Sequence, residues 1–131
     1  MGAAMVVEHL VPDGLWEAFQ RVAPPAPTRP QGGGRRRASE RDVLAAIVFA
    51  ATTGCTWRRV PPVFGASWQT IYRWFACWSD SGVWDRLHRA VSEDGGAPEW
   101  TRFAVQAVLA RAKQNTSGNE AANPETVNAA R

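Results

Sequence analysis

The chain has 131 residues, 45% of them hydrophobic, which is enough for one small core and too little for a large one. Its formal net charge of +3 hides a basic segment, since residues 29–73 hold eight arginines against only Glu40 and Asp42. No apolar run approaches the roughly 20 residues that cross a bilayer, and the first residues lack the positive start of a secretory signal, so we expect a cytoplasmic protein with reduced thiols.

Residues 1–23 are predicted to contain one short amphipathic helix that packs on the core. Asp13 is a candidate N-cap, and Pro24 and Pro25 would end the helix. The apolar residues of this helix are Leu15, Trp16, Phe19 and Val22.

Residues 24–38 combine prolines, three consecutive glycines and the arginines Arg35, Arg36 and Arg37. Such a composition cannot bury enough surface to order itself, which predicts a linker or arm. Because its positive charges run directly into the next helix, contact with a DNA backbone is one interpretation and an inert solvated linker is the other.

A domain spanning residues 39–94 is predicted to begin with a helix from about Glu40 to Thr53. Ser39 and Asp42 form an imperfect capping box, because the preferred partner is Glu or Gln. Gly54 is placed to end the helix in the left-handed conformation. The expected buried stripe consists of Val43, Leu44, Ile47, Val48 and Ala51.

A compact connector with Arg58 and Arg59 follows this helix. Pro61 and Pro62 forbid a long helix here, so at most one turn fits between Thr56 and Val60. The side chains expected to anchor the connector to the core are Trp57, Val60 and Phe64.

The next predicted helix begins after the N-cap Ser67, runs to about Ser79 and stops near Gly82. With successive residues about 100° apart, one broad apolar arc contains Trp68, Ile71, Tyr72, Trp74, Phe75 and Trp78. The opposite side contains Gln69, Thr70, Arg73, Ala76 and Cys77. No acidic residue lies on this second face, whose members are small or can hydrogen-bond a base edge or a phosphate.

The rest of the chain is predicted to hold one further helix and a poorly ordered end. A helix with core spacing covers Val83, Trp84, Leu87 and Val91, and "EDGGAP" breaks it. Residues 101–113 are expected to be poorly fixed, and residues 114–131 hold one aliphatic side chain larger than alanine, which predicts a disordered tail.

No metal site or cofactor is expected. Cys55 and Cys77 are 22 residues apart, in no CxxC arrangement and without a histidine close in sequence, which argues against zinc. His9 and His88 are isolated and are interpreted as surface or structural residues.

Together these elements predict an all-α, helix-turn-helix bundle of three to four helices that binds duplex DNA. The segment from Ser67 to Arg73 is expected to bind and read the DNA. Within it, Gln69 can pair with adenine, Arg73 with guanine or phosphate, and Thr70 with phosphate or a thymine methyl. The expected phosphate contacts are Arg35, Arg36, Arg37, Arg58 and Arg59. A polar outer face is also common on helices without this role, and a single-stranded binder that stacks bases on tryptophans is a less favoured alternative.

The order "TGCTWRRVPPVFG", "SWQTIYRWFACW" and "GVWDRLHRA" resembles the N-terminal region of bacterial insertion-sequence transposases of the insertion-sequence-five type, over roughly residues 9–113. The resemblance implies a helical domain that binds terminal inverted repeats. In the family this domain precedes a ribonuclease-H-like domain that cuts and joins DNA with three carboxylates and two metal ions.

The resemblance weakens in residues 95–131, which would be a remnant of the start of the catalytic domain. Gln106 occupies the position of the first expected aspartate, and a neutral amide cannot replace a carboxylate that holds two divalent cations. The other two carboxylates would lie beyond residue 131. We therefore expect no catalytic residue and no metal site in this chain.

The resulting hypothesis is sequence-specific binding to transposon ends without cleavage, in the bacterial cytoplasm at the nucleoid. One alternative is a subunit of an active transposase whose catalytic domain is on a second chain. Another is a protein-interaction module that uses the exposed edge of the tryptophan arc, and a homodimer is compatible with each.

Overall fold

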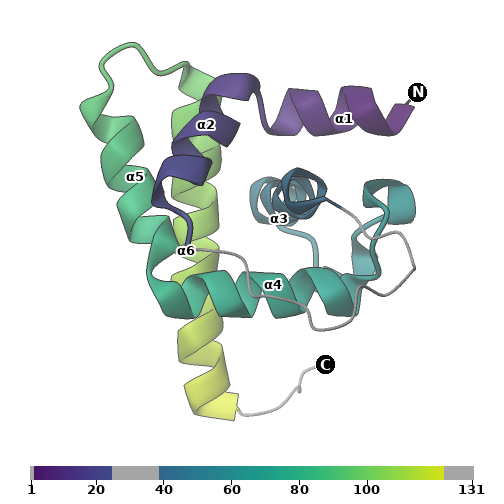
Figure 1. Ribbon diagram of the computed structural model, residues 1–131. Helices are drawn as coiled ribbons and strands as arrows, with labels where there is room; N and C mark the ends of the chain where they lie inside the picture. The colour runs from purple at the N-terminus through teal and green to yellow at the C-terminus, as the bar shows by residue number, and fades with distance from the viewer. Residues whose placement is uncertain (1, 25–38, 123–131) are drawn as a thin grey trace.

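The computed structural model describes residues 2–24 and 39–122 (Figure 1). Every regular element in these ranges is helical, which confirms the all-α prediction, although six α-helices form instead of three to four. The predicted contacts Arg35, Arg36 and Arg37, and residues 123–131 of the predicted tail, lie outside the described residues. The elements are α1 (Gly2–Leu10), α2 (Asp13–Val22), α3 (Glu40–Thr53), η1 (Trp57–Arg59), η2 (Pro62–Phe64), α4 (Trp68–Ser81), α5 (Val83–Glu93) and α6 (Glu99–Ala122), where η marks a 3₁₀ turn.

Helix α3 is the central helix of the bundle, viewed end-on between α1 and α4 in Figure 1. The Ser39 hydroxyl accepts a hydrogen bond from the amide of Asp42 at 3.1 Å, and Gly54 ends the helix with φ +76°, as predicted. Its alanines allow neighbouring helices to approach on several sides. The buried residues are Val43, Leu44, Ala45, Ala46, Ile47, Val48 and Ala50.

The N-terminal region differs from the sequence prediction in two respects. A second helix, α1, precedes the predicted one, and Asp13 is not a capping residue: Pro12 occupies the N-cap and makes no side-chain cap bond. The Asp13 carboxylate instead accepts a hydrogen bond from Arg41 of α3 at 2.9 Å, within a salt bridge. A tertiary charge pair has thus replaced the local cap.

The connector between α3 and α4 forms two short 3₁₀ turns. The first, η1, is the single turn expected before the prolines. Val60 and Phe64 are buried, which fixes both turns to the core. Gly65 ends η2 with φ +80°, a left-handed conformation that glycine adopts without a steric penalty.

Helices α4 and α5 meet at Gly82, which ends the first and begins the second with φ +79°. The chain bends sharply there, so α4 lies along one edge of the bundle and α5 rises from its end (Figure 1). The indole of Trp84 packs edge-on against Trp78 with ring centroids 6.0 Å apart. Phe75 adds a stacked contact with Trp84 at 6.1 Å. The bend is therefore held by aromatic contacts on its inner side.

Residues 101–113 were expected to be poorly fixed, and this prediction is wrong. They belong to α6, which packs against α3 and α5. The apolar side chains recur at helical spacing and fill the space between those helices. Residues 114–122 continue the helix, although they were assigned to the tail. The buried residues of α6 are Thr101, Ala104, Val105, Val108 and Ala112.

The buried side chains form one cluster that includes residues of all six helices and of the connector. Phe19 of α2 reaches across it to Trp78 of α4, with centroids 4.8 Å apart. Within residues 2–24 and 39–122, no helix is both long and apolar enough to cross a membrane.

Candidate nucleic-acid interface

The outer face of α4 is open to solvent, as its sequence pattern predicts. Gln69, Arg73 and Cys77 are exposed at intervals of one turn, and Thr70 and Ala76 are partly exposed beside them. The opposite side is buried through Ile71, Phe75 and Trp78. The predicted division into two faces is confirmed for these residues, but Trp68, assigned to the apolar arc, is only half-buried and lies under Arg58. Contact of the outer face with DNA stays a prediction.

Ser67 and Thr70 shape the beginning of α4. The amide of Thr70 donates to the Ser67 hydroxyl at 3.3 Å, and that hydroxyl lies 3.2 Å from Thr70 Oγ1. Ser67 is therefore occupied as the N-cap. The first turn contains no acidic side chain, so the partial positive charge of the helix start is not neutralised locally.

The 3₁₀ turn η1 places two exposed arginines next to this helix. The guanidinium carbon of Arg58 lies 5.4 Å from the ring centroid of Trp68, the first residue of α4. A guanidinium on an indole face keeps its N–H groups available around its edge. Arg59 is also exposed, and its side chain makes no hydrogen bond or ion pair with the described residues. Both arginines therefore have N–H groups free to donate to a phosphate.

The guanidinium groups of two other arginines already make hydrogen bonds within the protein. Arg41, which contributes to the basic segment, donates to the carbonyl of Val11 at 2.7 Å as well as to Asp13. Arg86 of α5 donates through Nη2 to the carbonyl of Val22 at 3.1 Å and through Nη1 to that of Ser81 at 2.9 Å. Net charge along the sequence thus overstates the number of guanidinium groups available to a partner.

Sequence reasoning missed Arg111 of α6. Its guanidinium donates to the carbonyls of Ala50 and Cys55 and lies over the ring of Trp57, so it reaches the connector from a segment that was expected to be loose. Burial lowers the pKa of Arg111 from its ordinary value, and the nearby Cys55 opposes this shift. The signal in the sequence was the apolar spacing of residues 101–112, which predicts a packed helix.

The two-metal site implied by the family resemblance does not fit the described residues. Within residues 2–24 and 39–122, no three His, Cys, Asp or Glu side chains gather where they could hold a metal ion. Gln106, at the expected position of the first aspartate, is an exposed amide on α6.

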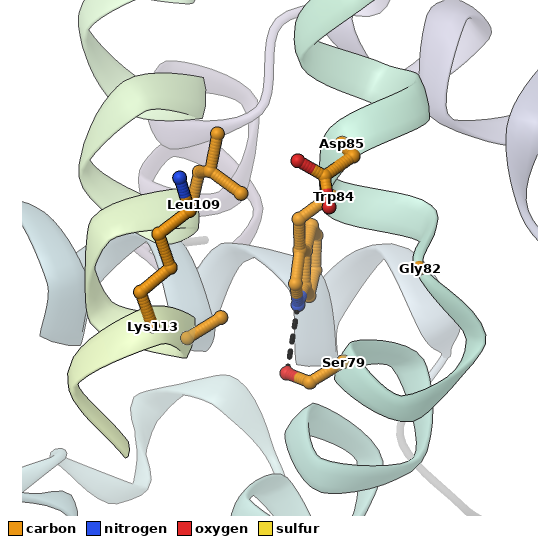
Figure 2. Close-up of a pocket in the computed structure, with 7 residues that line it drawn as sticks. Ser79, Gly82, Trp84, Asp85, Leu109 and Lys113 are labelled. Carbon is orange, nitrogen blue, oxygen red and sulfur yellow. Dashed lines mark hydrogen bonds between the residues drawn. The ribbon is translucent and has the colours of Figure 1, made fainter. Parts of the chain in front are cut away.

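A pocket of about 360 Å³ lies between α6 and the bend that joins α4 to α5 (Figure 2). Inside it, Trp84 Nε1 donates to the Ser79 hydroxyl at 2.9 Å. None of the predicted site residues lines this pocket, so it is not part of the outer face of α4. The lining residues are Ser79, Gly82, Trp84, Asp85, Leu109, Ala112 and Lys113.

Comparison with known proteins agrees with the resemblance seen in the sequence. Residues 11–88 match the family described as "Putative transposase of IS4/5 family". The chain is 35% identical over 105 residues to the "Insertion element IS402 uncharacterized 16.2 kDa protein" of Burkholderia cepacia, covering 79% of this chain and 71% of the relative. No solved structure matches. The chain therefore belongs to the IS4/5 family of insertion-sequence transposases.

Proposed function

We propose that this chain binds duplex DNA at the ends of an insertion element through the outer face of α4. The observation that supports this most is the exposure of Gln69 and Arg73 one turn apart, with no side-chain hydrogen bond to another described residue. Arg58 and Arg59 stand beside the same helix. Unpartnered planar side chains flanked by guanidinium groups are the combination that reads bases while phosphates hold the register.

The size and position of α4 suit the major groove, which is about 12 Å wide and admits one helix. The helix lies at an edge of the bundle, so α3 and α5 do not cover its outer side (Figure 1). Ala76 and Cys77 are small and allow the helix axis to come close to the base edges. Gln69 would pair with adenine, and Arg73 with guanine or phosphate.

The order α3, connector, α4 supports a helix-turn-helix interpretation. In such modules the first helix supports the second, which enters the groove. Here the two 3₁₀ turns η1 and η2 occupy the connection, and the buried Val60 and Phe64 hold it against the core. Arg58 and Arg59 lie in this turn segment. From there their side chains would reach a backbone phosphate beside the groove.

Footprinting of the purified protein on DNA flanking its gene, followed by fluorescence anisotropy on the protected duplex, tests the proposal. We expect Arg73→Ala to reduce the preference for this duplex over a scrambled one by about 1–3 kcal/mol. Arg59→Ala, the matched phosphate-contact variant, should weaken both duplexes alike and reduce the salt slope by about one. Absence of a footprint at low salt refutes the proposal, and identical behaviour of both variants refutes the division of roles.

Within this proposal, cleavage is not assigned to the described residues. The described residues offer no carboxylate cluster, and Gln106 cannot bind divalent cations as an aspartate would. A nicking assay on the protected duplex with Mg²⁺ or Mn²⁺ should show no product for this chain alone. Product formation by the purified chain, unchanged in Gln106→Ala, would show that cleavage arises elsewhere in it.

A further inference from the structure

Arg111 joins the C-terminal helix to the end of α3. Its Nη1 donates to the carbonyl of Ala50 at 3.2 Å, and its Nη2 donates to the carbonyl of Cys55 at 2.9 Å. Ala50 lies in the last turn of α3, and its carbonyl also accepts from the amide of Gly54 at 2.9 Å. A positive group at this end of a helix is favourable, since the carbonyls there carry partial negative charge.

The same guanidinium lies against the first residue of η1. Its central carbon is 4.7 Å from the ring centroid of Trp57. On the α4 side, the Trp57 ring lies 4.7 Å from that of Phe75 and 5.7 Å from that of Tyr72. Trp57 is therefore held between a cation from α6 and two aromatic rings of α4. Arg111 is half-buried, and a cation–aromatic contact is stronger where the cation is partly shielded from water.

The residues that follow Trp57 are Arg58 and Arg59. They share one 3₁₀ turn with it, and the amide of Arg59 donates to the carbonyl of Thr56 at 3.0 Å. A displacement of Trp57 from its contacts would shift the backbone of Arg58 and Arg59 relative to the start of α4, because the three residues share one tight turn. Arg111 contacts this turn at its beginning, through Cys55 and Trp57.

We infer that Arg111 is a positioning residue for DNA binding: acting from α6, it holds the Trp57–Arg59 turn against α4 and so sets where Arg58 and Arg59 meet phosphate. This inference rests on the function proposed above. It assigns α6 a role in binding although the helix lies outside residues 11–88, the range that matches the family. The alternative is that Arg111 only adds stability to the bundle.

Arg111→Met separates these two roles, because it removes the charge and both donors but keeps an extended apolar side chain. The matched control is Val105→Ala, which removes buried volume from the same helix nearly two turns away. The full-length variants are compared with the wild type by thermal unfolding, by the NMR resonances of the Trp57 indole and of the Arg58 and Arg59 amides, and by affinity for the footprinted duplex. All affinities are measured well below the unfolding transition.

We expect Arg111→Met to shift the three resonances and to weaken DNA binding about fivefold or more. Val105→Ala should lower the unfolding temperature, leave the three resonances in place and keep the affinity within about twofold. Arg111→Lys should show smaller resonance shifts and a smaller loss of DNA affinity than Arg111→Met. It keeps a cation but lacks the planar fork that reaches two carbonyls. If Arg111→Met does not fold, Arg111→Lys serves as the test variant, with smaller changes in the same direction.

Unshifted resonances in a folded Arg111 variant would overturn the inference. So would equal losses of affinity in the Arg111 and Val105 variants. If the wild type binds no duplex, the proposed function fails, and the inference about DNA fails with it. The NMR comparison then decides separately whether Arg111 holds the turn.

Discussion

Helices α4 and α5 are neighbours joined at Gly82, and both bury one apolar side while exposing a polar one. Their outer faces differ in charge. The face of α5 carries Asp85 and Glu93 one turn on either side of Arg89, whereas Asp80, at the far end, is the only acidic residue of α4. Acidic groups beside an arginine repel a polyanion and screen the positive charge.

The two helices also differ in what their polar groups already contact. Arg86 of α5 donates to carbonyls of Val22 and Ser81 and so helps to hold the bundle together. The side chains of Gln69 and Arg73 of α4 make no hydrogen bond to another described residue. An amphipathic pattern alone therefore does not identify a binding helix. What distinguishes α4 is that no acidic residue lies within one turn of Arg73 and that the side chains of Gln69 and Arg73 have no internal partner.

The largest expected effect is a loss of stability when a side chain on the inner side of α4 is shortened. Phe75 is fully buried and contacts the rings of Trp57 and Trp84. Phe75→Ala should lower the free energy of unfolding by about 3–5 kcal/mol, because it removes a large side chain and leaves a cavity. Urea denaturation followed by circular dichroism measures this change. A loss under about 1 kcal/mol would contradict the assigned packing of α4.

The next largest effect concerns DNA affinity and compares the outer faces of α4 and α5 directly. Arg73→Glu on α4 and Arg89→Glu on α5 make the same change in charge at exposed positions. We expect Arg73→Glu to cost about 3 kcal/mol of binding to the footprinted duplex, because a carboxylate would face the DNA. Arg89→Glu should change affinity by less than about threefold at physiological salt, where long-range charge effects are screened. Comparable losses in both variants would show that overall charge, not the α4 face, governs binding.

Much of this arrangement follows from local rules that the sequence expresses. Ser39 and Ser67 cap their helices, and Gly54 and Gly82 end helices in the left-handed conformation, as predicted. The two faces of α4 follow equally from the spacing of its aromatic residues. These features depend on a few neighbouring residues, so one sequence suffices to predict them.

The features that were missed depend on residues far apart in the chain. Asp13 has the chemistry of an N-cap, yet it pairs with Arg41, 28 positions away. Arg111 contacts Cys55, 56 positions away, because α6 packs against α3. Residues 101–113 were expected to be poorly fixed, because the helices that hold α6 in place, α3 and α5, come from other parts of the chain. Local patterns do not specify which of several chemically suitable partners a side chain meets.

A smaller effect concerns how the two helices begin. Ser67 caps α4 through its side chain, whereas Gly82 begins α5 without a side-chain cap. Ser67→Ala should lower the free energy of unfolding by about 1 kcal/mol, since the amide of Thr70 loses its acceptor. Ser92→Ala, at an exposed position of α5, is the control and should stay within about 0.5 kcal/mol. If the Ser67→Ala and Ser92→Ala variants lose the same stability in thermal denaturation, the Ser67 cap contributes nothing.

The smallest effect is expected at Cys77, an exposed free thiol on the outer face of α4. Its proposed contribution is its size, which lets the helix approach the bases. Serine has nearly the same size, so Cys77→Ser should change both stability and DNA affinity by less than about 0.5 kcal/mol. Denaturation and anisotropy on the footprinted duplex measure the two quantities. A loss of affinity at unchanged stability would mean that the thiol itself contacts DNA, and that α4 reads bases over a longer stretch than Gln69 to Arg73.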